Sequence, residues 1–430
     1  MLLFYHFLTT LLLTLLFPVL YPFRTRLRLR ERLALGLPNL GEPAAARLWV
    51  HALSVGEVLS SIPLLEALKR EYPSRELVLS VKTATGLKIA RQRLGEIIDY
   101  ILPMPLDFWW ASKRMIDTVK PALFIPVETD IWPGLISSLK RKGIRAVLVN
   151  GRISPRTEKS YARWRFFMKR VLGELEVCLV QTEIDQKRIM KGGIPWNRIT
   201  VTGNIKFDRK WGSMTQKDRQ RWCAVFGLKD RPIWVAGSTH YPEELHILNV
   251  FGQLLPAFPD LALIIGPREE GRFDAVYELA RENGFKVIRR TDLPATHHGC
   301  NVIILNTLGE LGVVYGLADV AFVGGSLVKK GGHNLLEPAA FGIPVLFGPH
   351  TYNFATMSQL LIRERGGRVV AGEPELLRSM EVLLSDTNER DRMGTRAREF
   401  VQHNQGALDR VMEILRPHIE MSSAQRNENE

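Results

Sequence analysis

The stretch Val320-Ala-Phe-Val-Gly-Gly-Ser-Leu-Val-Lys-Lys-Gly-Gly-His-Asn-Leu-Leu-Glu-Pro338 decides the fold class of this chain. Its first four residues, Val320–Val323, form a short apolar run that is typical of a buried strand. Four glycines and two lysines follow, and we expect a helix to begin near His333. A strand, a glycine-rich loop and a helix in this order indicate a βαβ unit of an α/β protein.

The same alternation of a short apolar run and a longer amphipathic stretch occurs along the rest of the chain. In the first half, the expected strands are residues 48–53, 77–81, 100–103, 123–127 and 146–149. A charged connector near residues 204–231 is followed by a second series at residues 233–236, 261–265, 287–288, 302–305, 320–323 and 345–347. Such repeats predict parallel sheets.

We therefore predict an α/β fold with two Rossmann-like domains that face a cleft. The first domain is expected to span residues 24–209 and the second residues 210–420, with a disordered polar tail at residues 421–430. In such sheets ligands bind beyond the carboxyl ends of the strands, so the chemistry is sought in the loops that follow the strands.

The N-terminal residues 1–23 contain no Asp, Glu, Lys or Arg and are dominated by Leu and Phe. As a helix they would be about 34 Å long, enough to cross a hydrocarbon core. An arginine cluster follows at residues 24–32, in the reverse order from a cleavable signal peptide. We expect a membrane-anchor helix with the remaining chain on the cytoplasmic side. Pro18 and Pro22 leave open whether it spans the bilayer or lies in its interface.

The formal net charge of +13 favours anionic partners. Nucleic acid is not expected, because zinc-ligand pairs, an arginine-rich recognition helix and an RNA-binding aromatic signature are all missing from the sequence. The three cysteines, Cys178, Cys223 and Cys300, form no disulfide framework and no metal-binding pair, and we expect reduced thiols.

Two loops of the first half carry candidate site residues. In the first, Gly56 would let the backbone approach a ligand closely, and Glu57 lies at the start of a helix, where it could act as a general base. Glu57 could equally stabilise the helix N-terminus. In the second, Glu128 and Asp130 precede Trp132 and form either a binding loop or a helix cap.

The second half carries a candidate anion site. Ser238 and Thr239 could offer hydroxyl groups at a helix start, and Arg268 just past a strand could grip a phosphate or a carboxylate, although it could also be an ordinary surface arginine. The amides of the glycine-rich loop could surround phosphate oxygens, and Glu337 could accept hydrogen bonds from both hydroxyls of a ribose. The alternative is an ordinary glycine-rich loop.

Two missing motifs narrow the chemistry. The sequence has no Walker-type phosphate loop, so ATP hydrolysis is not expected. It also has no D-x-D pair to hold a divalent metal, so the charge of a leaving group would be met by amides, arginine and lysine. We expect no metal and no cofactor.

An ordered series of motifs resembles the bacterial 3-deoxy-D-manno-octulosonic acid (Kdo) transferases, from the apolar N-terminus to about Val370. The motifs are H-A-x-S-V-G-E at residues 51–57, E-T-[DE]-x-W-P at 128–133, N-x-R-x-S at 150–154, G-N-x-K-F-D at 203–208, G-S-T-H at 237–240, G-E-L at 309–311, G-G-S-L at 324–327 and G-G-H-N-x-L-E-P at 331–338.

The resemblance implies a GT-B fold and transfer of Kdo from CMP-Kdo, with inversion and without a metal, to the lipid A precursor (lipid IVA) in lipopolysaccharide core biosynthesis. It further implies that CMP-Kdo is a substrate rather than a cofactor, and that inner-membrane lipid is a partner at the cytoplasmic face of the inner membrane. It assigns Glu57 as the catalytic base and Glu337 as the residue on the cytidine ribose, with Gly325, Ser326 and Asn334 in the loops around the donor phosphate and Arg268 as the family arginine. Together with the residues singled out above, the predicted donor-binding residues are Ser238, Thr239, Arg268, Gly325, Ser326, Gly332, Asn334 and Glu337, and the predicted acceptor-binding residues are Ser54, Gly56, Glu128 and Asp130.

One position departs from the family pattern. The sequence has Glu269 where the family usually has His, and an acid near an anionic donor is repulsive unless it points away. A transferase that uses a related acidic CMP-sugar therefore stays open, as do a sugar-nucleotide epimerase of the same fold and an inactive binding protein. The number of sugars transferred, the oligomeric state and the acyl-chain preference do not follow from the sequence.

Overall fold

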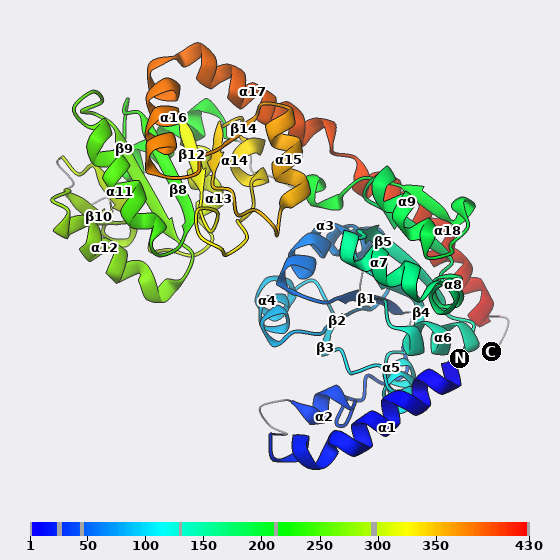
Figure 1. The fold of residues 1–430 in the computed structure, drawn as a ribbon. Coiled ribbons are helices and arrows are strands. Elements are labelled where there is room, and N and C mark those ends of the chain that lie inside the picture. The colour runs from blue at the N-terminus through cyan, green and yellow to red at the C-terminus, as the bar shows by residue number, and fades with distance from the viewer. Residues whose placement is uncertain are drawn as a thin grey trace. The chain divides into compact units, whose positions relative to one another are not determined.

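A computed structural model of the chain describes residues 2–23, 28–43, 47–128, 131–209, 214–293 and 299–427. The chain divides into two compact units (Figure 1). Unit 1 comprises residues 1–209 together with 404–430, and unit 2 comprises residues 210–403. Residue 209 also ends the first half that was expected from the sequence.

Unit 1 is built on a parallel seven-stranded sheet in the order β3-β2-β1-β4-β5-β6-β7. Its strands are β1 (Arg47–Ala52), β2 (Leu77–Val81), β3 (Tyr100–Pro103), β4 (Pro121–Pro126), β5 (Arg145–Gly151), β6 (Val177–Val180) and β7 (Ile199–Val201). Its helices are α1 (Leu2–Leu20), α2 (Leu29–Arg32), α3 (Val55–Glu71), α4 (Ala84–Leu94), α5 (Trp109–Val119), α6 (Pro133–Arg141), α7 (Pro155–Arg163), α8 (Arg165–Leu172), α9 (Glu183–Lys191) and α18 (Ala407–Asn427).

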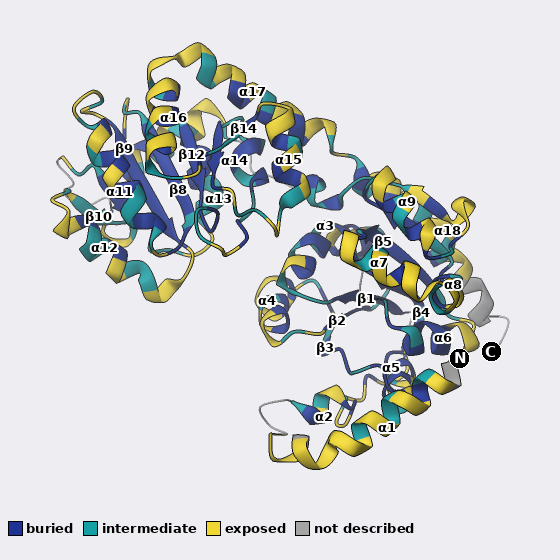
Figure 2. Cartoon of the chain, in the orientation of Figure 1, coloured by how far each residue is buried: buried dark blue, intermediate teal, exposed yellow. Residues whose placement is uncertain are grey.

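The central strands of this sheet are buried on both faces. Every residue of β1 is buried, and β1 pairs in parallel with β2 on one side and β4 on the other. Figure 2 shows these strands dark blue between helices whose outer faces are exposed. Burial on both faces explains why the strands appear in the sequence as continuous apolar runs rather than as alternating patterns.

The C-terminal helix α18 belongs to unit 1, which corrects the expectation that residues up to 420 form part of the second domain. Its buried residues Ala407, Val411, Leu415 and Ile419 recur every fourth position and join the core of unit 1. Both oxygens of the Asp208 carboxylate accept hydrogen bonds from amides at the start of the helix. Residues 421–427, expected to be disordered, continue the helix, and residues 428–430 lie outside the described part.

The N-terminal helix α1 is docked on unit 1 by its first two turns. The Tyr5 hydroxyl donates to the buried carboxylate of Asp107 at 3.0 Å. The His6 ring packs against Gly134, where a Cβ atom would lie only 2.5 Å from the ring. Most of the remaining helix is exposed (Figure 2). Within the described residues, no helix combines the length and the apolar character that are needed to cross a bilayer.

Unit 2 is built on a second parallel seven-stranded sheet in the order β10-β11-β9-β8-β12-β13-β14. Its strands are β8 (Ile233–Thr239), β9 (Ala262–Pro267), β10 (Val287–Arg289), β11 (Val302–Ile304), β12 (Val320–Val323), β13 (Val345–Phe347) and β14 (Gly367–Val369). Its helices are α10 (Gln216–Phe226), α11 (Glu243–Leu254), α12 (Phe273–Glu282), α13 (Leu311–Tyr315), α14 (Leu336–Ala340), α15 (Ala355–Arg363), α16 (Glu373–Ser385) and α17 (Thr387–His403).

All the strands expected from the sequence are present within a few residues of their predicted bounds, and three more complete the sheets. The additional strands β6, β7 and β14 are short and were not distinguished from their surroundings. The expected charged connector contains the helix α10, which begins with a capping box formed by Thr215 and Asp218. Helix α14 begins at Leu336, three residues later than expected.

The strand orders fix where each unit can bind a ligand. Successive strands are added to one side of β1 and then, from β4 on, to its other side. In unit 2 the same change of side occurs between β8 and β12. Loops leave such a switch point toward opposite faces of the sheet, which opens a crevice at the carboxyl ends of the two strands. The loops singled out in the sequence follow β1, β4, β8 and β12, so they lie at these two switch points.

Candidate functional site

The switch point of unit 1 places two buried carboxylates close together. Glu57 lies in the first turn of α3, directly after β1, and Glu128 follows β4. Each of the two residues is only 8% exposed. Ser60 connects them, because its hydroxyl lies 3.2 Å from Glu128 Oε1 and 2.9 Å from the backbone oxygen of Glu57. The structure thus brings together the two acidic residues that the sequence assigned to separate motifs.

Glu57 folds back on the backbone that precedes its helix. Its Oε2 accepts a hydrogen bond from the amide of Leu53, so the carboxylate does stabilise the helix N-terminus, as the simpler of the two readings required. This contact is made by Oε2, and the role of Glu57 as a general base stays a prediction. Ser54 is the N-cap residue of α3 without a side-chain cap hydrogen bond. Gly56 is exposed, and a Cβ there would make only an ordinary contact with the Ser54 hydroxyl, at 3.8 Å.

Glu128 is held in a strained backbone conformation by its surroundings. Its φ angle is +64°, in the left-handed region that non-glycine residues rarely adopt. Strain of this kind is stored mostly at functional sites. Lys206 neutralises the side chain, with its Nζ 2.8 Å from Glu128 Oε1. Lys206 was not assigned a role from the sequence, although it is the lysine of the G-N-x-K-F-D motif. Asp130, the remaining predicted acceptor residue, lies outside the described residues.

A cavity of about 330 Å³ lies in unit 1 beside the loop that follows β4. Tyr5 and Thr9 of α1 line one side of it, and Lys82, Asp107 and Trp132 line the other. The Lys82 ammonium lies 4.5 Å from the centre of the Trp132 ring, a cation–π contact that holds the two side chains together. The N-terminal helix therefore contributes directly to the wall of a cavity at the carboxyl edge of the sheet.

The switch point of unit 2 is organised by a residue that the sequence analysis passed over. Glu243, in the first turn of α11, is completely buried, and its carboxylate accepts four backbone hydrogen bonds. The donors are the amides of His240 (3.0 Å), Gly325 (2.7 Å), Ser326 (3.0 Å) and Leu327 (2.9 Å). Glu243 therefore occupies the position at which a phosphate was expected to meet the glycine-rich loop.

Gly325 and Ser326 were expected to contact the donor phosphate, and in this structure their amides donate to Glu243 instead. Their contact with the donor stays a prediction. Ser326 is also fully buried, and its hydroxyl donates to the carbonyl of Val323 and accepts from the amide of Gly348. Ser326 thus holds together the loops that follow β12 and β13. Gly325 has a φ of +67°, and a Cβ there would lie 2.8 Å from the His333 ring.

The remaining predicted donor residues differ in accessibility. Thr239 is fully buried, whereas Ser238 is half-buried in a left-handed conformation with φ +56°. Of the two, Ser238 is thus the one that a ligand can reach. Arg268 is exposed directly after β9, and its amide donates to the carbonyl of Thr239. Gly332 donates its amide to the carbonyl of Gly325 and is turned inward.

Asn334 and Glu337 form a linked pair at the start of α14. Asn334 accepts the amide of Leu336 at 3.2 Å and donates to Glu337 Oε1 at 3.3 Å. The Asn334 side chain therefore binds the first amide of α14 and orients Glu337, which is half-buried. Burial, with the Glu337 charge as the second cause, raises the pKa of the neighbouring Tyr315 hydroxyl. The Tyr315 hydroxyl packs directly against Gly237.

Two stacked histidines lie among these loops. His240 Nε2 and His333 Nε2 are 2.9 Å apart, and their rings are nearly parallel. Burial, with the positive charge of Arg268 as the second cause, lowers the pKa of His333 to about 3. Burial also lowers the pKa of His240, against the opposing effect of Glu243. Both rings are therefore neutral at physiological pH, and one donates a hydrogen bond to the other.

Glu269, which departs from the resembled pattern, lies beside this pair. Its Oε1 is 3.6 Å from His240 Nδ1, and its side chain is mostly exposed. The positive charges of Arg268 and Lys330 lower the pKa of His240, whereas the negative charge of Glu269 raises it. The accessible part of the site is thus a cationic patch made by Arg268 and Lys330 with one acidic neighbour. Among the described residues, no three His, Cys, Asp or Glu side chains cluster closely enough to hold a metal ion.

A protein-family model and several known proteins match this chain. The family described as "3-Deoxy-D-manno-octulosonic-acid transferase (kdotransferase)" matches residues 27–209. The 3-deoxy-D-manno-octulosonic acid transferase of Haemophilus influenzae is 35% identical over 399 residues, which cover 92% of each chain. The enzyme of the same name from Bordetella pertussis is 30% identical over 87% of each chain.

Solved structures with low sequence identity share the fold. A glycosyltransferase from Rickettsia africae is 13% identical, with a TM-score of 0.56 over 87% of this chain and 99% of that one. A UDP-GlcNAc 2-epimerase from Neisseria meningitidis bound to UDP-GlcNAc is also 13% identical, with a TM-score of 0.57 over 86% of this chain and 99% of that one. The fold alone does not separate transferases from epimerases, but the sequence relatives do. This chain belongs to the 3-deoxy-D-manno-octulosonic acid transferase family of glycosyltransferases.

Proposed function

We propose that this chain transfers Kdo from CMP-Kdo to a hydroxyl group of the lipid A precursor, lipid IVA, with inversion at the anomeric carbon. The observation that carries the proposal is the buried carboxylate of Glu57 at the switch point of unit 1, in a chain that belongs to the Kdo transferase family. A carboxylate that is largely shielded from water can take a proton from an alcohol as the alcohol attacks.

The proposed reaction is a single displacement. The acceptor hydroxyl gives its proton to the Glu57 carboxylate, and its oxygen forms a bond to the anomeric carbon of Kdo. The bond from that carbon to the phosphate oxygen breaks, and the electron pair leaves with CMP. Attack from the face opposite to the leaving group inverts the anomeric centre, and no further reactant is needed.

Glu128 and Lys206 support acceptor binding in this proposal. Their ion pair is rigid, because Ser60 and the strained backbone at Glu128 fix the carboxylate. The adjacent cavity, with Lys82 at its wall, offers a cation to a phosphate of the lipid A precursor. The apolar side chains of that cavity suit the lipid portion of the same molecule.

The donor side relies on cations rather than on the amides of the glycine-rich loop. Glu243 already occupies the amides of Gly325 and Ser326, so the charge of the departing CMP falls to Arg268, Lys330 and the accessible Ser238. Glu337, oriented by Asn334, is left to accept the ribose hydroxyls. We also propose that α1 attaches the protein to the cytoplasmic face of the inner membrane, where a lipid acceptor is concentrated.

The direct test mixes the purified full chain with CMP-Kdo and lipid IVA and analyses the lipid by mass spectrometry. The proposal expects lipid IVA to gain the mass of at least one Kdo residue, with CMP released in equal amount. Gain of no mass, with or without hydrolysis of CMP-Kdo, would contradict it. The same spectrum shows whether one or several sugars are transferred.

A transferase for a related acidic CMP-sugar is the second candidate, because Glu269 stands near the donor-side cations. Its negative charge should repel a donor carboxylate that lies beside it, so an acidic CMP-sugar whose carboxylate is placed differently would be favoured. CMP-N-acetylneuraminic acid in the same assay distinguishes the two donors. Faster transfer from that sugar than from CMP-Kdo would favour the second candidate.

A further inference from the structure

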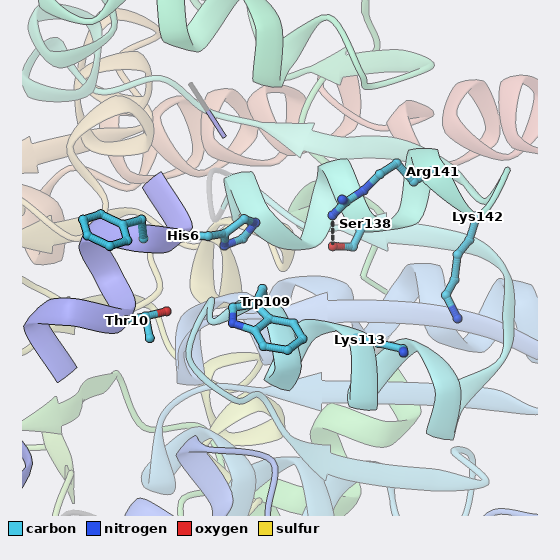
Figure 3. A pocket seen from close by; sticks show the side chains of 8 residues that line it. His6, Thr10, Trp109, Lys113, Ser138, Arg141 and Lys142 are labelled. Carbon is cyan, nitrogen blue, oxygen red and sulfur yellow. Dashed lines mark hydrogen bonds between the residues drawn. The ribbon is translucent and has the colours of Figure 1, made fainter. Parts of the chain in front are cut away.

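A second cavity in unit 1, of about 540 Å³, lies where α1 passes over α5 and α6. It is separate from the two switch points, and no role follows for it from the proposed reaction. Figure 3 shows the side chains that surround it. They are His6, Phe7, Thr10, Trp109, Lys113, Ser138, Arg141 and Lys142.

Among the residues that line this cavity, His6 is unusual because its ring is buried without hydrogen-bond partners. The residue is 8% exposed, and neither of its ring nitrogens has a hydrogen-bond partner. Burial is the main cause that lowers the pKa of His6, so the ring is neutral and carries one N–H donor. A buried donor without a partner costs free energy, unless a ligand supplies the partner. Figure 3 shows the ring directed from α1 toward Ser138 and Arg141.

The rest of the polar lining is cationic. Lys113 comes from α5, and Arg141 and Lys142 come from the end of α6. Lys142 pairs with Asp117, but neither Lys113 nor Arg141 has a carboxylate within 4 Å among the described residues. Arg141 instead contacts the hydroxyl of Ser138 at 3.2 Å. The Ser138 hydroxyl donates its own proton to the carbonyl of Gly134 at 2.7 Å, so it only orients Arg141. The N–H donor of His6 and the cations of Arg141 and Lys113 around one cavity are suited to an anion with several acceptor oxygens, such as a phosphate.

The surface around this cavity is apolar. Phe7 at its rim is 63% exposed and Trp109 is 51% exposed. The Tyr5 and Phe167 rings lie 5.8 Å apart, which places α8 beside α1. Helix α8 adds an exposed Phe166, preceded by an exposed Trp164. Exposed aromatic residues next to arginine and lysine are typical of helices that lie in a membrane interface.

We propose that the cavity between α1, α5 and α6 binds the phosphate of an anionic phospholipid, while α1 and α8 lie along the membrane interface. The phosphate accepts a hydrogen bond from His6 and is neutralised by Arg141 and Lys113. The acyl chains pass along the exposed apolar side of α1. The inference rests on the proposed attachment of α1 to the membrane, but not on the chemistry at Glu57.

The test compares the full chain with its His6→Phe variant in sedimentation with phosphatidylglycerol vesicles that contain no lipid A precursor. Phenylalanine keeps an aromatic ring and adds apolar character, so insertion driven by apolar contact alone would strengthen binding. The headgroup site predicts the opposite, a partition coefficient about fivefold lower, which corresponds to about 1 kcal/mol. Equal or stronger binding by the variant would overturn the site.

A charge-matched pair separates the site from general electrostatic attraction. Arg141→Gln and Lys229→Gln each remove one positive charge, but Lys229 is an exposed residue of unit 2. The site predicts about fivefold weaker binding for Arg141→Gln and wild-type binding for Lys229→Gln. Equal losses in both would contradict it. Unchanged thermal unfolding of His6→Phe shows that a loss of binding is not a loss of folding.

Two further outcomes locate the source of the phosphate. A thermal shift of the wild type by inorganic phosphate at constant ionic strength, lost in His6→Phe, would identify a soluble anion site and overturn the lipid assignment. Failure of the wild type to bind any vesicle would overturn the attachment of α1 as well. Kdo transfer in detergent should stay at the wild-type rate in His6→Phe, so these outcomes are independent of the proposed reaction.

Discussion

Replacing Glu243 by Gln should release the loop that follows β12. The carboxylate accepts four backbone amides at 2.7–3.0 Å in a completely buried position. Glutamine keeps one acceptor oxygen but turns an NH2 group toward two of the four amides. Two charge-assisted hydrogen bonds are therefore lost. Two buried backbone N–H groups then face the NH2 group of the glutamine, which is itself a donor and cannot accept from them.

The size of the effect follows from the number of bonds. A hydrogen bond to a charged group contributes about 1.5–3 kcal/mol, so the loss of two gives about 3–6 kcal/mol. Because whole domains are stable by only about 5–15 kcal/mol, Glu243→Gln should open the loop, and it could unfold unit 2. The assay is amide hydrogen exchange of residues 325–327 in the full chain. Protection should fall by about 10²-fold or more.

A matched variant checks that the effect comes from the buried position. Glu278→Gln makes the same chemical change on the surface of α12 in the same unit, where Glu278 pairs with Arg281. It should change the free energy of unfolding by less than about 0.5 kcal/mol. Both variants are compared by hydrogen exchange of the amides of residues 325–327. If these amides are as well protected in Glu243→Gln as in Glu278→Gln, Glu243 does not hold the loop that follows β12.

Three further changes test other parts of the structure. Ser326→Ala removes the hydroxyl that connects two loops and should lower the free energy of unfolding by about 1–3 kcal/mol, measured by urea titration. His333 is neutral when folded, with its pKa near 3, but titrates near 6.5 when unfolded; its contribution is therefore complete above pH 6.5 and decreases as the pH falls toward 3. Relative to His333→Asn, the wild type should lose up to about 1.4 kcal/mol per pH unit in that window, measured by urea titrations at several pH values. Tyr5→Phe removes the hydroxyl that donates to Asp107, so the docking of α1 should weaken by about 1 kcal/mol. A protease should then cut α1 faster in limited proteolysis.

Much of the fold could be predicted because its signals are local. Strands such as Leu77–Val81 and Val320–Val323 are continuous apolar runs, which a parallel sheet with both faces covered requires. The loops after β1, β4, β8 and β12 could be placed at the carboxyl edge of each sheet, because ligands bind at that edge in parallel sheets. Glu57 was expected at a helix start, and it lies there.

The features that were missed depend on contacts between distant parts of the chain. Glu243 bonds to amides more than 80 residues away, and nothing in its own motif distinguishes it from the adjacent Glu244. Asp208 caps α18 across about 200 residues, so the return of the C-terminal helix to unit 1 had no local signal beyond the apolar spacing of α18 itself. Ser326 looked like a ligand contact because sequence shows a residue's type but not its burial.

The account depends most on Glu57 as the group that removes the proton from the acceptor. The decisive measurement is the rate of Kdo transfer by Glu57→Gln, with CMP binding followed by calorimetry and Glu66→Gln, an exposed residue of the same helix, as the control. We expect turnover to fall by about 10²-fold or more in Glu57→Gln, with unchanged affinity for CMP and a normal rate in the control. Near-normal turnover by Glu57→Gln would contradict the proposed mechanism.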